Sequence, residues 1–296
     1  MADLNNSELN RKPRRHMSMQ TKRTVTNTFI YILLVIISII WIAPFIFLVL
    51  QSFDVASKGL TGNIWPDKWG IDNYAYLFSS DCDFLRWYFN TFIIALCVAI
   101  GQTAMQIMMA YALSRFRFKL RKTLMNMMLI LGMFPGFLTM IVLYEVLNSF
   151  NMVGDNAVPG LIIVSIASSG MGYYVVKGFL DTMPKSLDEA AMVDGANRFQ
   201  VFYKVILPLC KPIVIYTILT SFMGPWGDYI FAAAIAKTSS SGMNVAAGLS
   251  FLLNSGPDYY KYFCAGGVLV AIPVVILFLF LQKYYVEGVT GGAVKG

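Results

Sequence analysis

The sequence predicts an all-α membrane protein with six transmembrane helices, and three observations support this fold class. Hydrophobic residues make up 57% of the 296 residues and charged residues only 13%, whereas soluble domains carry about 25% charged residues. Apolar runs recur that are long enough to cross a bilayer, which takes about 20 residues. Basic residues gather beside these runs and are distributed unevenly between the two sides of the predicted membrane.

The apolar runs divide the chain into spans and loops. The spans are expected at residues 28–50, 88–113, 124–146, 158–180, 210–233 and 262–285. An even number of spans places both termini on one side of the membrane. The regions expected from this division are a basic tail (1–26), a first helix with an outer loop (27–86), a five-helix core (87–286) and a C-terminal tail (287–296).

The basic residues predict which side is cytoplasmic, because loops rich in lysine and arginine stay inside. Of the 23 lysines and arginines, those expected outside are Lys58, Lys68, Arg86, Lys237 and Lys261. Both termini and the 182–208 loop are therefore expected in the cytoplasm. The basic tail is not a cleavable signal peptide, since the apolar run after it exceeds the roughly 7–15 residues of such segments.

Composition and motifs also exclude several functions. The chain lacks the phosphate-binding sequence G-x-x-x-x-G-K-[ST], so we expect it to bind no ATP and no other cofactor itself. Its four cysteines are scattered without a C-x-x-C pair, so no metal site and no catalytic cluster are expected. The net charge of +7 follows membrane topology and does not indicate nucleic-acid binding. An enzyme is not expected, while an ion-coupled secondary transporter is kept as an alternative.

The 182–208 loop predicts two short helices. In the first, Ser186 and Glu189 have the spacing of a capping box, and Gly195 suits the left-handed conformation that ends a helix. Its centre carries the small residues Ala190 and Ala191. Acidic residues edge this small-residue patch, namely Asp188, Glu189 and Asp194. A helix with so little side-chain bulk suits docking into a groove of another protein.

The second short helix has its own start signal. Asn197 and Gln200 have the spacing of a further cap. Four apolar residues recur at helical spacing and predict one apolar stripe: Phe199, Phe202, Tyr203 and Ile206. The dipeptide Leu207-Pro208 is expected to close the unit, because proline removes a helix hydrogen bond.

The fifth span contains the run Gly224-Pro-Trp-Gly-Asp-Tyr229, which predicts a broken helix. Asp228 is a carboxylate within the membrane and is therefore a candidate for a substrate path. Trp226 and Tyr229 beside it could offer aromatic faces to a ligand. Alternatively, Asp228 only satisfies backbone groups that the break sets free.

The third span carries a comparable irregularity. Gly132 and Gly136 have small-xxx-small spacing around Pro135. This spacing predicts close helix packing together with a proline kink, with no ligand involved.

The 182–208 loop resembles a known family. The pattern E-A-A-x-x-x-G, nine residues, then aliphatic-x-L-P is matched by Glu189–Gly195 and Val205–Pro208. This resembles the cytoplasmic loop of binding-protein-dependent ABC importer permeases. The stretches Ala110–Phe118, Met133–Pro135 and Gly288–Gly296 extend the similarity to MalG-type permeases of maltose/maltodextrin transporters.

The resemblance implies a type I (MetI-like) ABC transporter transmembrane domain in a bacterial plasma membrane. Such a permease would translocate malto-oligosaccharides or related sugars, or else another oligosaccharide or glycoside. The implied partners are a second, MalF-type permease, an ATPase homodimer that holds ATP-Mg, and an extracytoplasmic sugar-binding protein. Because the partner permease contributes most of the sugar site in this family, the resemblance argues against substrate contact by Trp226, Asp228 or Tyr229.

The resemblance also assigns roles to particular residues. The residues implied to couple the permease to the ATPase are Ser186, Glu189, Ala190, Ala191, Asp194, Gly195, Leu207 and Pro208. Those implied to reach between the ATPase subunits are Gly291, Gly292, Val294 and Lys295 in the tail. Glu189 has two interpretations, as the local cap or as an ion-pair partner of the ATPase. Asp194 near a helix C-terminus costs about 0.3–1 kcal/mol, which favours a cation of the partner there.

Overall fold

The computed structural model describes residues 19–59, 63–168 and 172–291. Throughout these residues the regular structure is helical, apart from one isolated bridge between Asp54 and Trp69. The longer elements are α1 (Met19–Ser52), α2 (Asp72–Leu77), α3 (Phe84–Arg115), α4 (Arg121–Gly132), α5 (Gly136–Ser149), α6 (Ala157–Ala167), α7 (Gly172–Asp181), α8 (Ser186–Val193), α11 (Lys211–Gly227), α12 (Ile230–Ala236), α13 (Val245–Asn254) and α14 (Tyr260–Gly291). The shorter ones are η1 (Gly154–Asn156), α9 (Arg198–Gln200), η3 (Val201–Ile206), α10 (Leu207–Leu209), η4 (Ser240–Gly242) and η5 (Pro257–Tyr259). The all-α prediction is confirmed.

The chain forms two units, one ending at Leu48 and one beginning at Val49. The first unit holds most of α1, whose apolar side chains, such as Phe29 and Trp41, are exposed along the helix. An apolar helix of this length suits a lipid bilayer, because its backbone N–H and C=O groups bond to one another and need no water. The helix begins at Met19, inside the segment predicted as a polar tail.

The number of spans reaches the predicted six when each of two bent helix pairs is counted as one span. Four helical segments of the described residues are long and apolar enough to cross a membrane, and six if two bent pairs are each counted as one span. The four are Arg23–Ser52, Phe84–Arg115, Gly154–Asp181 and Pro257–Gln282. The bent pairs are α4 with α5, and the α9–α10 segment with α11.

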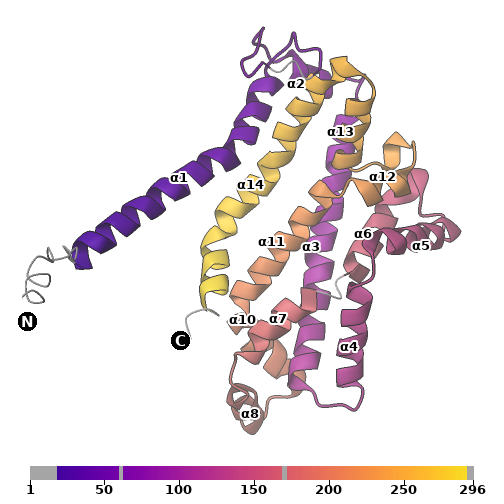
Figure 1. The fold of residues 1–296 in the computed structure, drawn as a ribbon. Helices are drawn as coiled ribbons and strands as arrows, with labels where there is room; N and C mark the ends of the chain where they lie inside the picture. The colour runs from indigo at the N-terminus through magenta and orange to yellow at the C-terminus, as the bar shows by residue number, and fades with distance from the viewer. Residues whose placement is uncertain (1–18, 60–62, 169–171, 292–296) are drawn as a thin grey trace, which may run out of the picture. The chain divides into compact units, whose positions relative to one another are not determined.

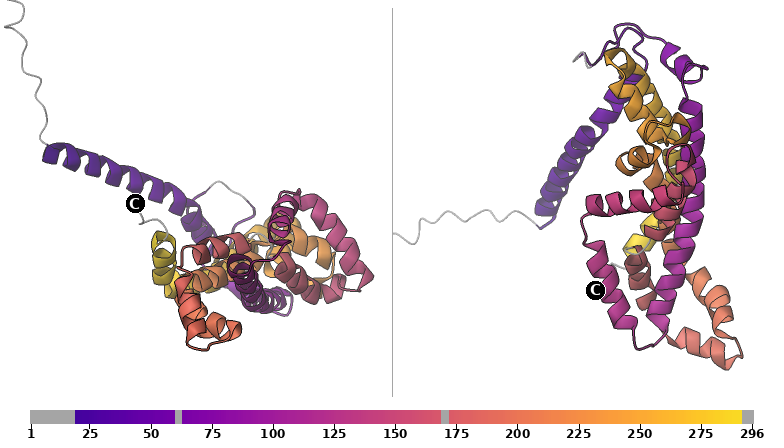
Figure 2. Two further views of the ribbon diagram at one scale, coloured as in Figure 1. Left: turned by 90° about the horizontal axis from the view of Figure 1, so that it is seen from below. Right: turned by 90° about the vertical axis from the view of Figure 1, so that its right-hand side faces the viewer.

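The third span departs most from its prediction. A bend of 98° separates α4 from α5 at Met133–Pro135, and Figure 2 shows the two helices (magenta) nearly at right angles. Pro135 is the N-cap of α5, so the expected kink is a complete break. The predicted close packing is not found at Gly136, where a Cβ would meet no atom of the described residues within 4 Å.

In the second unit, α3 is the central helix, and α6, α7, α11 and α13 pack against it (Figure 1). Two buried apolar clusters lie along it. One cluster includes Trp87, Ala95 and Phe222. The other surrounds Tyr173 and Ile206 and packs against Ala191 of α8. The core therefore extends from the α13 end of α3 to the α8 end.

The 235–260 region between the last two predicted spans was expected to be a loop, but it contains helix α13, several residues of which are buried. Gly248 faces Trp87 so closely that a Cβ would lie 2.2 Å from the indole ring. Sequence reasoning missed this helix because its ten residues are too few to cross a bilayer and give no span signal.

Candidate functional site

Helix α8 is the first of the two helices predicted in the 182–208 loop, and it lies at the end of the second unit where α3 also ends (Figure 1). The predicted capping box at its start is wrong. The N-cap is Lys185, whose backbone carbonyl accepts from the N–H groups of Asp188 and Glu189, and no side chain caps the helix. Because the helix begins one residue early, Ser186 lies inside the first turn, where it cannot serve as the cap for Glu189. Glu189 is exposed and free of that local role.

The predicted stop at Gly195 is confirmed. Gly195 has φ +86°, and its N–H donates to the carbonyl of Met192 (3.1 Å). The N–H of Ala196 donates to the carbonyl of Ala191 (3.0 Å), which completes a Schellman motif. A Cβ at Gly195 would meet nothing within 4 Å, so the backbone conformation, not space, requires glycine here.

The second short helix begins as predicted and continues differently. Asn197 and Gln200 form a reciprocal capping box, with bonds of 2.9 and 2.8 Å. The next turn is a π-helix, in which Val201 and Ile206 are the buried pair. Their spacing of five residues follows the i→i+5 repeat of a π-helix. The prediction of one apolar stripe assumed α-helical spacing and is wrong for Phe199 and Tyr203, which face outward. Leu207 and Pro208 then form α10, and the unit ends at Cys210 with a bend of 79°.

Several apolar residues of the 182–208 loop are exposed. We use the term docking face for four of them, Ala190, Val193, Phe199 and Tyr203. Val193 is 88% exposed, Phe199 74% and Tyr203 62%. Exposed apolar residues on a segment between two spans indicate a partner surface, because water contact at such side chains is unfavourable. Glu189 and Asp194 are exposed on the same helix.

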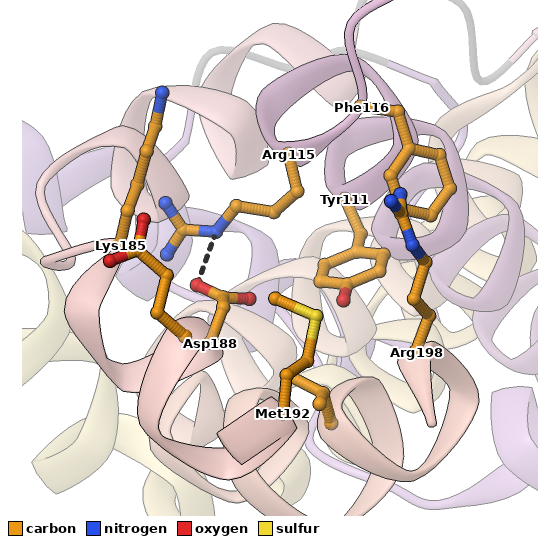
Figure 3. A pocket seen from close by; sticks show the side chains of 9 residues that line it. Tyr111, Arg115, Phe116, Lys185, Asp188, Met192 and Arg198 are labelled. Carbon is orange, nitrogen blue, oxygen red and sulfur yellow. Dashed lines mark ion pairs between the residues drawn. The ribbon is translucent and has the colours of Figure 1, made fainter. Parts of the chain in front are cut away.

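Asp188 was predicted at the edge of the small-residue patch that would face a partner, but it is buried. Its side chain points inward and forms an ion pair with Arg115, the last residue of α3 (Figure 3). The pair borders a cleft of about 130 Å³, in which Arg198 lies over the Phe116 ring at 5.1 Å. The residues lining the cleft are Tyr111, Arg115, Phe116, Lys185, Asp188, Glu189, Met192, Arg198 and Val201.

The break in the fifth span is confirmed. Helix α11 ends at Gly227 and α12 begins at Ile230. The Asp228 carboxylate interacts with the backbone N–H groups of Phe231 and Ala232, as expected if it satisfies groups at the break. Trp226 is buried against Tyr88 and Phe222, whereas Tyr229 is exposed.

Sequence reasoning missed the residue that holds this break in place. The side chain of Asn244 is buried, and its amide donates to the carbonyls of Pro225 (3.1 Å) and Asp228 (2.7 Å). Its carbonyl oxygen caps α13 by accepting from Ala247 (2.9 Å). The available signal was an asparagine directly before an apolar run, which is typical of a helix start.

Of the tail residues assigned by resemblance, the structure places only Gly291. Helix α14 continues to Gly291, beyond the predicted end of the span. Gly292, Val294 and Lys295 lie outside the described residues. Over the residues that are described, no group of three or more His, Cys, Asp or Glu side chains could hold a metal ion.

These features define a multi-pass helical membrane protein with a short helix, α8, between two spans. Residues 103–291 match the family described as "Binding-protein-dependent transport system inner membrane component". The chain belongs to this family. It is a permease subunit of an ABC transporter and not an enzyme, since ATP hydrolysis is carried out by a separate subunit.

Several relatives cover most of the chain. The maltodextrin transport system permease protein MalD of Streptococcus pneumoniae is 35% identical over 285 residues, covering 94% of this chain and 99% of the relative. The galactooligosaccharides transport system permease protein GanQ of Bacillus subtilis is 34% identical, with the same coverage. The maltose/maltodextrin transport system permease protein MalG of Salmonella typhimurium is 32% identical, covering 87% of this chain and 93% of the relative.

A solved structure confirms the fold. The chain resembles a bacterial ABC transporter involved in the import of the acidic polysaccharide alginate, with a TM-score of 0.73. The match covers 91% of this chain and 99% of that chain at 21% identity. The fold is therefore that of an ABC importer permease, the MetI-like fold that the sequence predicts.

Proposed function

We propose that this chain is the permease subunit of an ATP-driven importer of malto-oligosaccharides or related oligosaccharides. The named relatives transport maltodextrins and galactooligosaccharides, which supports an oligosaccharide as the substrate class. Maltodextrin is favoured because several of the similar permeases carry that name. A different oligosaccharide or glycoside is the second candidate, supported by the galactooligosaccharide relative.

The observation that carries the mechanism is the docking face. An ATPase subunit that seats α8 in a cleft would cover Val193 and approach the backbone closely at Ala190. ATP-driven closure of the ATPase dimer would then move α8 as a rigid piece, because Gly195 separates it from the anchored α9–α10 segment. Glu189, without a local capping role, is available for an ion pair with the partner. Two global states and a contact that differs between them are the requirements for such coupling.

The complete transporter in this proposal contains four further kinds of component. They are a MalF-type permease, a homodimeric ATPase holding ATP-Mg, an extracytoplasmic sugar-binding protein, and the lipid of a bacterial plasma membrane. An alginate transporter of similar fold has been solved with a sugar-bound periplasmic protein, which supports the binding protein as a partner. Both termini and the docking face would be cytoplasmic, as the basic residues predict. The tail residues Gly291, Gly292, Val294 and Lys295 would reach the ATPase.

A thiol-accessibility experiment tests the docking face and its side of the membrane together. Val193→Cys is introduced into a chain whose four cysteines are replaced by serine, and Trp65→Cys in the 51–86 loop is the matched control. We expect an impermeant thiol reagent to label Val193→Cys only from the cytoplasmic side, and the co-expressed ATPase to protect it. Trp65→Cys should be labelled only from outside, with or without the ATPase. Labelling of Val193→Cys that the ATPase leaves unchanged would contradict the proposal.

The substrate requires a separate measurement. The complete transporter is placed in liposomes with ATP inside and its binding protein outside. Uptake of radiolabelled maltotriose is compared with uptake of a galactotriose of equal length. We expect maltotriose to be preferred, and preference for the galactoside would favour the second candidate.

A further inference from the structure

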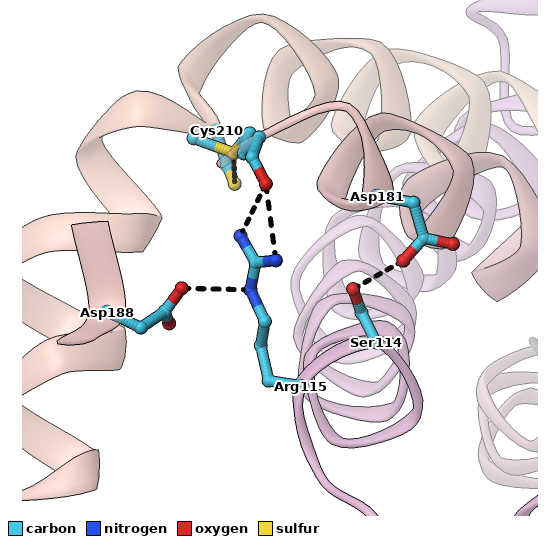
Figure 4. Close-up of polar contacts among 6 residues, drawn as sticks. Ser114, Arg115, Asp181, Asp188 and Cys210 are labelled. Atoms are coloured by element: carbon cyan, nitrogen blue, oxygen red, sulfur yellow. Dashed lines mark hydrogen bonds and ion pairs between the residues drawn. The ribbon is translucent and has the colours of Figure 1, made fainter. Parts of the chain in front are cut away.

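The end of α3 is fastened to the segment that leads into α8. Arg115, the last residue of α3, places its Nε atom 3.2 Å from Oδ2 of Asp188 in the first turn of α8 (Figure 4). Its Nη1 and Nη2 atoms both donate to the carbonyl of Met183 at 3.3 Å. A single guanidinium thus holds both sides of the turn between α7 and α8.

The contact is buried. The side chain of Arg115 is 5% exposed and that of Asp188 11%. Two ion pairs are found among the described residues, and the other joins Lys177 to Asp181 within α7. The pair of Arg115 and Asp188 is therefore the one that connects α8 with a membrane-spanning helix.

The neighbouring residue of α3 makes a contact of a different kind. Ser114 donates to Oδ1 of Asp181 at 2.6 Å, which ties α3 to the end of α7 and not to α8. The two adjacent residues of α3 can therefore be altered separately. Ser114 offers a matched control at the same depth and on the same helix.

The physical difference between an ion pair and apolar packing decides what each can transmit. Apolar contacts are non-directional, so they fix the position of a helix less specifically than a pair of opposite charges does. A buried charge that loses its partner is strongly unfavourable, so Asp188 cannot leave Arg115 without a large penalty. A displacement of α8 therefore acts on the end of α3. Helix α3 is in turn in contact with α7 and α11.

We propose that Arg115 and Asp188 are positioning residues that transmit the displacement of α8 to α3 during transport. This inference rests on the proposed function, because it assumes that an ATPase moves α8. Neither residue touches ATP or sugar in this mechanism. The pair converts a movement outside the membrane into a movement of the central span.

The experiment measures sugar uptake per ATP hydrolysed in the reconstituted transporter, a ratio that a lower amount of folded protein does not change. In Asp188→Asn, which keeps the side-chain size, and in Arg115→Met, we expect assembly with the ATPase and a ratio reduced about tenfold, within the range of measured coupling effects. The exchanged pair, Arg115→Asp with Asp188→Arg, should recover part of the ratio. Ser114→Ala should keep the wild-type ratio.

Three results would count against the positioning role of Arg115 and Asp188 or against the proposed function. A wild-type ratio in assembled Asp188→Asn or Arg115→Met would overturn the inference. If no charge-altered variant assembles, the pair serves folding alone and the positioning role is rejected. If wild-type transporter shows no ATP-driven sugar uptake at all, the proposed function fails, and this outcome is distinct from wild-type transport with unaffected variants.

Discussion

The segments that pack at the two ends of α3 differ in how their side chains are covered. At one end, the segment around Asn244 is closed by hydrogen bonds within the chain. The Asn90 amide donates to the carbonyls of Ser241 and Met243, and Thr91 accepts from the N–H of Val245. At the other end, α8 is held by Arg115 while its docking face stays uncovered.

The difference shows where the chain is complete by itself and where it needs a partner. At the Asn244 end, the Asn244 amide and the carbonyls of Pro225 and Asp228 are paired within the chain, which favours a fixed arrangement, although the buried Nε1 of Trp226 has no hydrogen-bond partner among the described residues. The α8 end keeps large apolar side chains in contact with solvent, a state that association would relieve. Substitutions at the Asn244 end should therefore reduce stability, and substitutions at the α8 end should reduce transport while leaving the fold intact.

The largest effect is expected at Gly195. Replacing it with arginine puts a Cβ at φ +86°, which costs roughly 1–2 kcal/mol of local strain and alters the turn after α8. We expect the variant to be inserted in the membrane but to lose sugar-stimulated ATP hydrolysis and uptake by more than about tenfold. Both rates are measured in the reconstituted complex. Wild-type values for both rates would show that the turn does not contribute to coupling.

The next largest effect is expected on stability, at Asn244. Asn244→Ala removes three hydrogen bonds at a residue that is 1% exposed. We expect a loss of about 3 kcal/mol in the free energy of unfolding, since each bond is worth about 1 kcal/mol and buried carbonyls are left unpaired. The measurement is denaturant unfolding of the purified permease in detergent.

Asn254 supplies the control for this prediction. It is exposed and donates to the carbonyl of Ser250 within its own helix. Asn254→Ala should change the unfolding free energy by less than about 0.5 kcal/mol. Equal losses of unfolding free energy in Asn244→Ala and Asn254→Ala would show that the buried hydrogen bonds of Asn244 add no more stability than an exposed side chain does.

A smaller effect is expected on the docking face. Val193→Ser should leave stability within about 0.5 kcal/mol, because the side chain is exposed. Burial of a valine side chain is worth about 1.5–3 kcal/mol, so the affinity for the ATPase should fall at least about tenfold. The affinity is measured by titrating labelled ATPase against the permease in nanodiscs. An unchanged affinity would mean that Val193 stays exposed in the complex.

The smallest effect is expected at the C-terminal tail. Deletion of residues 289–296 should lower uptake without lowering the amount of permease in the membrane. The reason is the proposed contact of Gly291, Gly292, Val294 and Lys295 with the ATPase; the deletion removes these residues together with the last turn of α14, which ends at Gly291. Uptake and membrane abundance are measured in the same cells. Unchanged uptake would show that the tail contributes nothing to transport, as expected of a frayed chain end.

Local sequence determined much of this protein. The apolar runs predict the spans, because a bilayer requires long apolar helices. Gly195 and the pair of Asn197 and Gln200 predict where short helices end and begin, because these choices depend on neighbouring backbone groups. The same loop carries the pattern by which the family is recognised, and the family match confirms that recognition.

Only the tertiary structure showed the features that require contacts between residues far apart in the sequence. The inward position of Asp188 requires Arg115 at the end of another helix, and no local pattern announces it. The packing of α13 requires the fit of Gly248 against Trp87, and the break that the sequence predicts at Asp228 has its carbonyls bound by the distant side chain of Asn244. Such contacts join residues far apart in the chain, so hydropathy and capping rules, which depend on near neighbours, could not reveal them. The docking face itself became visible only once the fold showed which apolar residues of the 182–208 loop remain uncovered.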